Sequence, residues 1–111
     1  MSRDTDCVFC ERIAAGDASA ETDLAVAFPD AYPVSPGHTL VVPRRHEPDY
    51  FALEPEEQRA LWSLAAEVRS SLEREHQPAG YNVGVNVGEA GGQTVPHVHL
   101  HVIPRYEDDV Q

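Results

Sequence analysis

Residues 97–101 read His-Val-His-Leu-His, so that single apolar residues separate three histidines. Successive side chains of an extended chain point to opposite faces, which places His97, His99 and His101 on one face and the apolar residues in the core. Neighbouring imidazoles would then stand roughly 6.5–7 Å apart along the chain. The run therefore predicts a strand with a histidine face, which Pro104 terminates.

The remaining chain predicts helices and strands in an α+β arrangement. Apolar residues recur at helical spacing in one long segment, whereas shorter apolar or alternating runs between prolines and glycines indicate strands. A length of 111 residues suits one compact domain, taken as 1–111, with a mainly antiparallel sheet. The expected elements are a short helix over 7–15 that stops at Gly16, strands over 24–28, 38–42 and 81–87, and a long helix over 55–76.

Composition narrows the class of protein. Eight arginines, no lysine and 19 acidic residues give a net charge of −11, which argues against binding to nucleic acid. The sequence has no apolar run of about 18 residues, so we expect no membrane span. The N-terminal residues are polar and lack a secretory signal, and a cytoplasmic location follows as the expectation.

Three interpretations fit the histidine run. It could be a half-exposed strand whose polar face happens to be histidine. It could bind a metal, because neutral imidazole is a common zinc ligand, although the segment lacks the carboxylate that often completes a hydrolytic site. It could also carry out covalent phosphoryl chemistry, with one imidazole as nucleophile and its neighbours binding phosphate oxygens. The residue types alone leave the last two open.

A second group of reactive residues is the pair Cys7-x-x-Cys10 near the N-terminus. In a cytosolic protein such a pair is more often metal-binding or redox-active than a structural disulfide. Two thiols do not complete a tetrahedral site, so two inert or redox-sensitive thiols remain the alternative.

With these segments in place, the sequence resembles the histidine triad (HIT) superfamily, whose signature is His-x-His-x-His-x-x with hydrophobic x. Three other segments follow the family's order, and together they cover most of residues 7–106. They are Cys-Val-Phe-Cys at 7–10, Pro-Gly-His-Thr-Leu-Val-Val-Pro at 36–43 and Gly-Gly-Gln-Thr-Val at 91–95. The resemblance implies a HIT-like α+β fold with a mainly antiparallel sheet, one long helix and a short N-terminal helix, usually assembled as a homodimer.

The resemblance also implies a nucleotide hydrolase that needs no cofactor for its chemical step. His99 would attack the α-phosphorus of a purine nucleoside 5′-phosphoramidate or a related nucleotide, forming a nucleotidyl-histidine that water hydrolyses. His101 and His38 would contact the phosphate oxygens, and the Thr94 hydroxyl would lie near the leaving group. The alternatives are a dinucleoside polyphosphate hydrolase and a slow-turnover nucleotide-binding or sensing module.

Five further residues map to substrate binding by the same resemblance. Asp30 would accept the ribose hydroxyls, Phe9 and Phe28 would form the wall of the base pocket, and Asn86 and Gln93 would donate to phosphate or ribose oxygens. Each has a simpler alternative: a turn for Asp30, loop support for the two amides and core packing for the two phenylalanines.

Finally, the resemblance to bacterial and archaeal members implies a structural zinc held by Cys7, Cys10, His46 and His97. Such a site would tether the N-terminal segment and fix the ring next to the nucleophile.

Three arginines had two possible roles. Arg44, Arg45 and Arg105 either contact a polyphosphate or lie at the surface.

Overall fold

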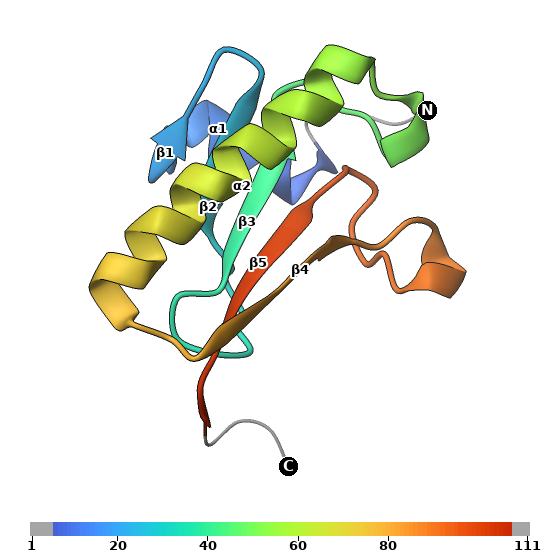
Figure 1. Ribbon diagram of the computed structural model, residues 1–111. Coiled ribbons are helices and arrows are strands. Elements are labelled where there is room, and N and C mark those ends of the chain that lie inside the picture. The colour runs from blue at the N-terminus through green and yellow to red at the C-terminus, as the bar shows by residue number, and fades with distance from the viewer. Residues whose placement is uncertain (1–5, 108–111) are drawn as a thin grey trace.

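The computed structural model describes residues 6–107 and shows a five-stranded antiparallel sheet with one helix on each face (Figure 1). The strand order is β1-β2-β3-β5-β4, and every neighbouring pair is antiparallel. This confirms the α+β fold with a short N-terminal helix and a long second helix. The elements are α1 (Val8–Ala15), β1 (Ala20–Glu21), β2 (Ala25–Pro29), β3 (Thr39–Pro43), the 3-10 turn η2 (Tyr50–Ala52), α2 (Pro55–His76), β4 (Gly80–Val85), the 3-10 turn η3 (Glu89–Gly91) and β5 (Leu100–Arg105).

Helix α2 covers one face of the sheet and has the predicted bounds. Its apolar stripe is buried, and Leu61 and Leu64 have no exposed surface. Pro55 takes the first helical position, where its missing N–H costs no intrahelical bond, and Glu54 and Glu57 form a capping box. The apolar stripe of α2 packs with Ala25, Ala27, Val41, Val98, Leu100 and Val102 into one core cluster. Among residues 6–107, no helical segment combines the length and the apolar character that a membrane span requires.

Helix α1 packs near the opposite face, where Phe9 joins Val26, Phe28, Leu40 and Val42 in a second core cluster. The helix ends, as predicted, at Gly16, whose φ of 75° is a left-handed conformation that suits glycine. Strand β2 is buried on both faces, which explains why its sequence is a continuous apolar run rather than an alternating one.

The predicted histidine strand was wrong at its start. Strand β5 begins at Leu100, so His97 and His99 precede it. Two hydrogen bonds draw the backbone of this segment away from the ladder: the His97 N–H donates to the Val95 carbonyl at 2.8 Å, and the Val98 N–H donates to the Glu47 carbonyl at 2.8 Å. The segment therefore turns instead of extending, and the ring centroids of His99 and His101 lie 5.1 Å apart.

Two strand ends also differ from the prediction. Pro104 does not terminate β5; it lies inside the strand opposite Tyr81 of β4. The pairing of β5 with β3 stops at Val102, so a missing N–H at position 104 costs no bond on that side. Strand β4 ends at Val85 rather than at residue 87, and β1 was not predicted at all because two residues carry no periodic signal.

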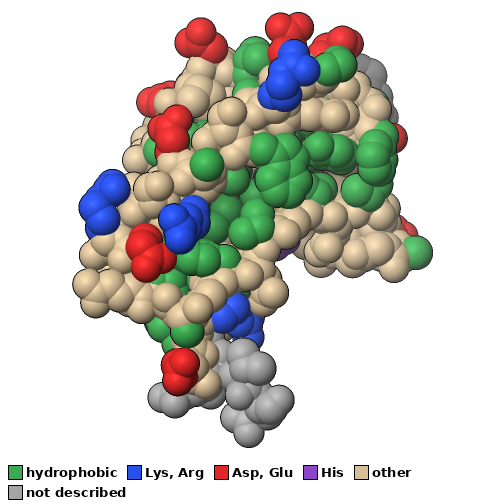
Figure 2. All heavy atoms as spheres, in the orientation of Figure 1, with side chains coloured by type: hydrophobic (Ala, Val, Ile, Leu, Met, Phe, Trp, Pro, Cys, Tyr) green, Lys and Arg blue, Asp and Glu red, His purple; other side chains and the backbone are tan. Residues whose placement is uncertain are grey.

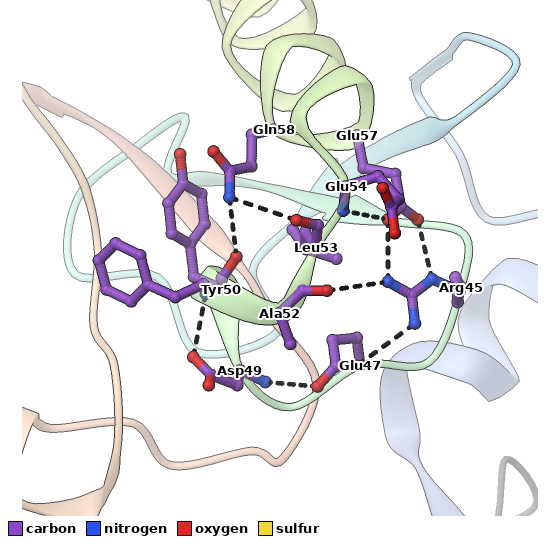
Figure 3. A network of polar contacts seen from close by, with 10 residues as sticks. Arg45, Glu47, Asp49, Tyr50, Ala52, Leu53, Glu54, Glu57 and Gln58 are labelled. Carbon is purple, nitrogen blue, oxygen red and sulfur yellow. Dashed lines mark hydrogen bonds and ion pairs between the residues drawn. The ribbon is translucent and has the colours of Figure 1, made fainter.

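Arg45 fastens the connection between β3 and α2 (Figure 3). Its guanidinium donates to both carboxylate oxygens of Glu57, at 3.0 and 2.9 Å, and to Glu47 at 3.3 Å. Glu57 also accepts from the Glu54 N–H at 2.8 Å. The hydrogen bond to Arg45 lowers the pKa of Glu57, although burial opposes the shift. The guanidinium of Arg45 is therefore held by carboxylates of the same chain.

Replacing Arg45 by methionine is expected to leave the buried Glu57 carboxylate without its partner. We expect Arg45→Met to lower the free energy of unfolding by about 1–3 kcal/mol, a range reduced because Arg45 is half exposed. The lowered pKa of Glu57 contributes stability that is present above the ordinary value of 4.5 and is lost as pH falls through the folded value. Urea titrations from pH 7 to pH 3 should show the gap between the two proteins closing in acid.

Arg44 provides the control for this prediction, because its partners are the exposed Glu21 carboxylate and the backbone carbonyls of Thr22 and Asp23. Arg44→Met should change stability by less than about 1 kcal/mol. Equal losses for the two variants at pH 7 would contradict a special role for Arg45.

Candidate active site and metal centre

Antiparallel pairing of β3 with β5 brings three histidines together. Leu40 of β3 lies opposite His101, and His38 directly precedes β3. The Nε2 of His38 lies 2.9 Å from Nδ1 of His101, and the rings of His99 and His101 meet edge to face. Residues about 60 positions apart in sequence thus share one site because of strand register.

Hydrogen bonds determine where His38 and His101 carry their protons. The Val34 N–H can only donate, and it lies 3.2 Å from Nδ1 of His38, so a neutral His38 carries its proton on Nε2. That proton is donated to Nδ1 of His101, which leaves the Nε2–H of His101 for another acceptor. The chain of donors runs from Val34 through both rings.

Burial keeps these two rings neutral near pH 7. Desolvation lowers the pKa of His38 below its ordinary 6.5, and Asp30, with a carboxylate oxygen 3.4 Å from Nε2, partly offsets the shift. Burial also lowers the pKa of His101, and the neighbouring His99 and His38 add to the effect. His101 therefore offers a neutral N–H donor.

His99 has the opposite arrangement of nitrogens. Its Nδ1 lies 2.8 Å from the carbonyl oxygen of His97, which can only accept, so Nδ1 carries the proton. Nε2 then holds a lone pair, as a nucleophile requires. The ring is 4% exposed and packs 5.0 Å, centroid to centroid, from Phe9. The His97 carbonyl and the Phe9 ring together fix the orientation of the His99 ring.

His99 and His101 open onto a pocket of about 300 Å³. Val8 and Phe9 of α1 and Leu40 of β3 form an apolar part of its wall, and α1 also contributes Arg12. The rest comes from the loops after β2 and before β5 and from β5 itself. Its lining residues are Val8, Phe9, Arg12, Asp30, Ala31, Tyr32, Leu40, Thr94, Val95, His99 and His101. The volume suits one small organic ligand rather than a macromolecule.

The expected substrate residues occupy different depths of this pocket. Phe9 lines the pocket, whereas Phe28 has no exposed surface and lies behind Phe9. The centroids of the two rings are 5.7 Å apart. Asp30 lines the pocket and also closes a turn, because one carboxylate oxygen accepts from the Tyr32 N–H at 2.8 Å. Its other oxygen faces His38. The turn considered for Asp30 is therefore present, and the same side chain borders the pocket.

Thr94 is exposed at the pocket edge, and its hydroxyl makes no hydrogen bond within residues 6–107. Gln93 instead uses its amide to hold the loop: it accepts from the Gly88 N–H and donates to the carbonyls of Pro48 and Val95. Asn86 lines a neighbouring hollow of about 340 Å³, which also reaches His38 and His101.

Among the lining residues that the sequence did not predict, one is charged. Arg12 lines the pocket, and helical spacing could have found it, since it lies four residues after Val8 and three after Phe9 on α1. Arg44, Arg45 and Arg105, the arginines considered from sequence, do not line this pocket.

The cysteine pair meets two histidines beside the segment that carries His99. The ligand atoms of Cys7, Cys10, His46 and His97 lie within 4.8 Å of one another. Nδ1 of His97 lies 3.3 Å from the Cys7 sulfur and 3.5 Å from the Cys10 sulfur, and Nδ1 of His46 lies 3.4 Å from the latter. The four side chains therefore converge at the N-terminal end of α1.

This donor set fits zinc. Tetrahedral coordination with ordinary Zn–S and Zn–N bonds puts sulfur and nitrogen ligands about 3.6 Å apart, close to the three separations here. Nε2 of His97 lies 2.9 Å from the Pro43 carbonyl, so it donates there and leaves Nδ1 unprotonated for a metal. Two thiolates and two imidazoles would fill a structural site, with no open position for substrate.

Comparison with known proteins identifies the family. The HIT domain matches residues 14–108. An uncharacterized 16.1 kDa HIT-like protein of Mycoplasma pneumoniae is 42% identical over 105 residues, which are 92% of this chain and 73% of that protein. The bis(5′-nucleosyl)-tetraphosphatase of Schizosaccharomyces pombe is 40% identical over 88 residues, 79% of this chain and 48% of that enzyme.

Solved structures show the same fold. A HIT family protein from Bacillus anthracis has a TM-score of 0.86 at 41% identity, covering 94% of this chain and 77% of that one. A Zn-bound histidine triad family protein from Mycobacterium smegmatis has a TM-score of 0.84 at 34% identity, covering 96% and 80%. With its three histidines, its pocket and these relatives, the chain belongs to the histidine triad (HIT) family.

Proposed function

We propose that this protein is a nucleotide hydrolase that attacks the α-phosphorus of a purine nucleoside 5′-phosphoramidate or a related nucleotide. The carrying observation is the bond from Nδ1 of His99 to the His97 carbonyl, which leaves the lone pair of Nε2 at the pocket. Relatives with named activities support hydrolysis of nucleotides: the fission yeast tetraphosphatase, and an Arabidopsis thaliana protein described as a bis(5′-adenosyl)-triphosphatase and adenylylsulfatase.

The proposed reaction has two displacements at phosphorus. Nε2 of His99 forms a bond to the α-phosphorus, and the leaving nitrogen departs with the electron pair of the P–N bond and takes a proton from water, relayed by the Thr94 hydroxyl. The Nε2–H of His101 donates to a phosphate oxygen as charge develops. Water then attacks the nucleotidyl-histidine and loses a proton to solvent, and the P–N bond electrons return to His99.

The nucleoside would be held on the other side of the pocket. We assign the Asp30 carboxylate to the ribose hydroxyls and the wall formed by Phe9, with Phe28 behind it, to the base. Asn86 is assigned as a donor to substrate oxygens. Gln93 is assigned an indirect role, because it holds the loop that carries Thr94.

Dinucleoside polyphosphates are the second candidate substrate, because the fission yeast relative is named for that activity. The hollow beside Thr94, where the leaving group is assigned, favours the phosphoramidate instead. The described residues that line it are Pro48, Gly88, Glu89, Gln93, Thr94, Val95 and Pro96, none of which is a cation. A polyphosphate leaving group would meet no cation among them to neutralise its charge.

Replacing the nucleophile tests the mechanism. His99→Ala is expected to lower hydrolysis of adenosine 5′-phosphoramidate by at least about 10³-fold, because the covalent route is lost, while nucleoside monophosphate binding is retained. Turnover of the phosphoramidate and of diadenosine polyphosphates should be measured side by side.

The outcomes separate the candidate functions. Undiminished hydrolysis by the variant would reject His99 as the nucleophile. Preference for the dinucleotide would favour the second candidate, and tight nucleotide binding without turnover by the wild type would make the protein a binding module.

We further propose a structural zinc at Cys7, Cys10, His46 and His97. When bound, the ion would supply a rigid crosslink between α1 and the segment that precedes β5, with no role in the chemical step. The donor geometry supports this site, and the Mycobacterium smegmatis relative is described as zinc-bound.

Protein purified without chelator is expected to contain about one equivalent of zinc per chain, because four suitable donors already converge. Cys10→Ser should reduce this content and lower the melting temperature, whereas Ser19→Ala, outside the cluster, should leave the zinc content unchanged. Less than about one-tenth of an equivalent in the wild-type protein, measured by elemental analysis, would reject the site.

A homodimer is proposed through β4, the edge strand of the sheet. Within residues 6–107 this strand pairs with β5 alone, and Val83 on it is 45% exposed. Phe51 and Trp62 are also exposed, and Figure 2 shows hydrophobic side chains gathered on the face beside α2. An unpaired edge next to apolar surface favours pairing with a second copy.

Light scattering after size exclusion is expected to give twice the 12.2 kDa chain mass. Val83→Asp should shift the mass toward one chain because it places a charge on the edge strand. Leu24→Asp, at the far side of the sheet, serves as the matched control. A wild-type mass of a single chain would disprove the dimer.

A further inference from the structure

Arg12 is a cation at the wall of the nucleotide pocket in a strongly acidic protein. Its guanidinium carbon lies 4.1 Å from the centre of the Phe28 ring. Nη1 donates to the Pro29 carbonyl at 2.7 Å, and Nε lies 3.5 Å from the Asp17 carboxylate. The side chain is therefore held in place, with 25% of its surface exposed.

One end of this guanidinium is available to a ligand. Within residues 6–107, Nη2 makes no hydrogen bond, although the group borders the pocket. Among the residues that line the pocket, Arg12 is the one arginine, and there is no lysine. A fixed, planar donor with an unused N–H pair suits recognition of a ligand acceptor better than a mobile surface cation does.

The position of Arg12 in the pocket matches the base rather than the reacting phosphate. The phosphate end is defined by His99 and His101, whereas Arg12 belongs to α1, which also supplies Val8 and Phe9 to the wall. A purine packed on this wall would turn its edge toward the guanidinium.

We infer that Arg12 selects the base of the substrate, favouring purines with acceptors at both O6 and N7, namely guanine and hypoxanthine, over adenine. This inference rests on the proposed function, since it concerns the nucleotide of that same site. Guanine O6 and N7 both accept from an arginine, whereas adenine presents an amino donor at N6 that opposes the guanidinium N–H. The Phe28 ring and the Pro29 carbonyl hold the donor in register for this contact.

Equilibrium binding of three nucleoside monophosphates, the products of the proposed hydrolysis, tests the inference without depending on turnover. Wild-type protein is expected to bind GMP and IMP about 10-fold more tightly than AMP. This factor lies in the lower part of the range for a bidentate contact with a base, because Arg12 is partly exposed. IMP lacks the 2-amino group of GMP, so equal affinities for these two identify the O6 and N7 edge as the feature recognised.

Two variants of Arg12 separate base recognition from other roles. Arg12→Met keeps most of the apolar stem and removes the donors, so GMP and IMP affinities should fall to that of AMP while AMP affinity stays within about 2-fold. Arg12→Gln carries an amide that both donates and accepts, and should move the preference toward AMP. Arg44→Met, which lies outside the pocket, should reproduce the wild-type ratios.

Several results would overturn the inference. An equal loss of affinity for all three nucleotides in Arg12→Met would assign Arg12 to the ribose or phosphate. Unchanged ratios in both variants, or equal affinities of the wild type for GMP and AMP, would reduce Arg12 to a support for Phe28. If wild-type protein bound none of the three, the proposed function itself would fail, and that result is distinct from nucleotide binding without base preference.

Discussion

The rest of the site depends on one hydrogen bond, from Nδ1 of His99 to the carbonyl oxygen of His97. At 2.8 Å, this bond holds the proton on Nδ1 and leaves the lone pair of the ring on Nε2. The His97 ring donates from Nε2 to the Pro43 carbonyl and presents Nδ1 to two cysteine sulfurs. Displacing His97 would therefore alter the His99 ring and the cysteine–histidine cluster together, which makes the pocket and the cluster one structural unit.

The sheet supplies the rigidity that this contact requires. Core clusters lie on both of its faces, with α2 against one and Phe9 of α1 against the other. Because Phe9 lies between the two cysteines in sequence and packs against the rings of both His97 and His99, the cysteine–histidine cluster and the pocket wall share one short helix. Tight packing transmits any displacement of α1 to these two rings.

His38 and His101 are neutral rather than charged where they meet beside the pocket. The Val34 N–H sets the proton position of His38, which sets that of His101, and burial lowers the pKa of both. In the proposed reaction, a donor oriented in this way needs no reorganisation when charge develops on a phosphate oxygen. The Asp30 carboxylate raises the pKa of both rings and so partly offsets the effect of their burial.

The sequence by itself determined the elements with strong periodicity and the residues of the site. The stripe of α2 and the stop at Gly16 follow from local patterns, because spacing and turn chemistry are properties of short segments. The histidines at 97, 99 and 101 and the cysteine pair also stand out by spacing, whereas His38 and His46 were assigned by the family resemblance. Tertiary structure decided what depends on partners distant in sequence. The pull of the Glu47 carbonyl on Val98 shortened the histidine strand, and the early end of the β3 ladder admitted Pro104 into β5. The contact between His38 and His101, which strand pairing brings together, set the proton position of His101.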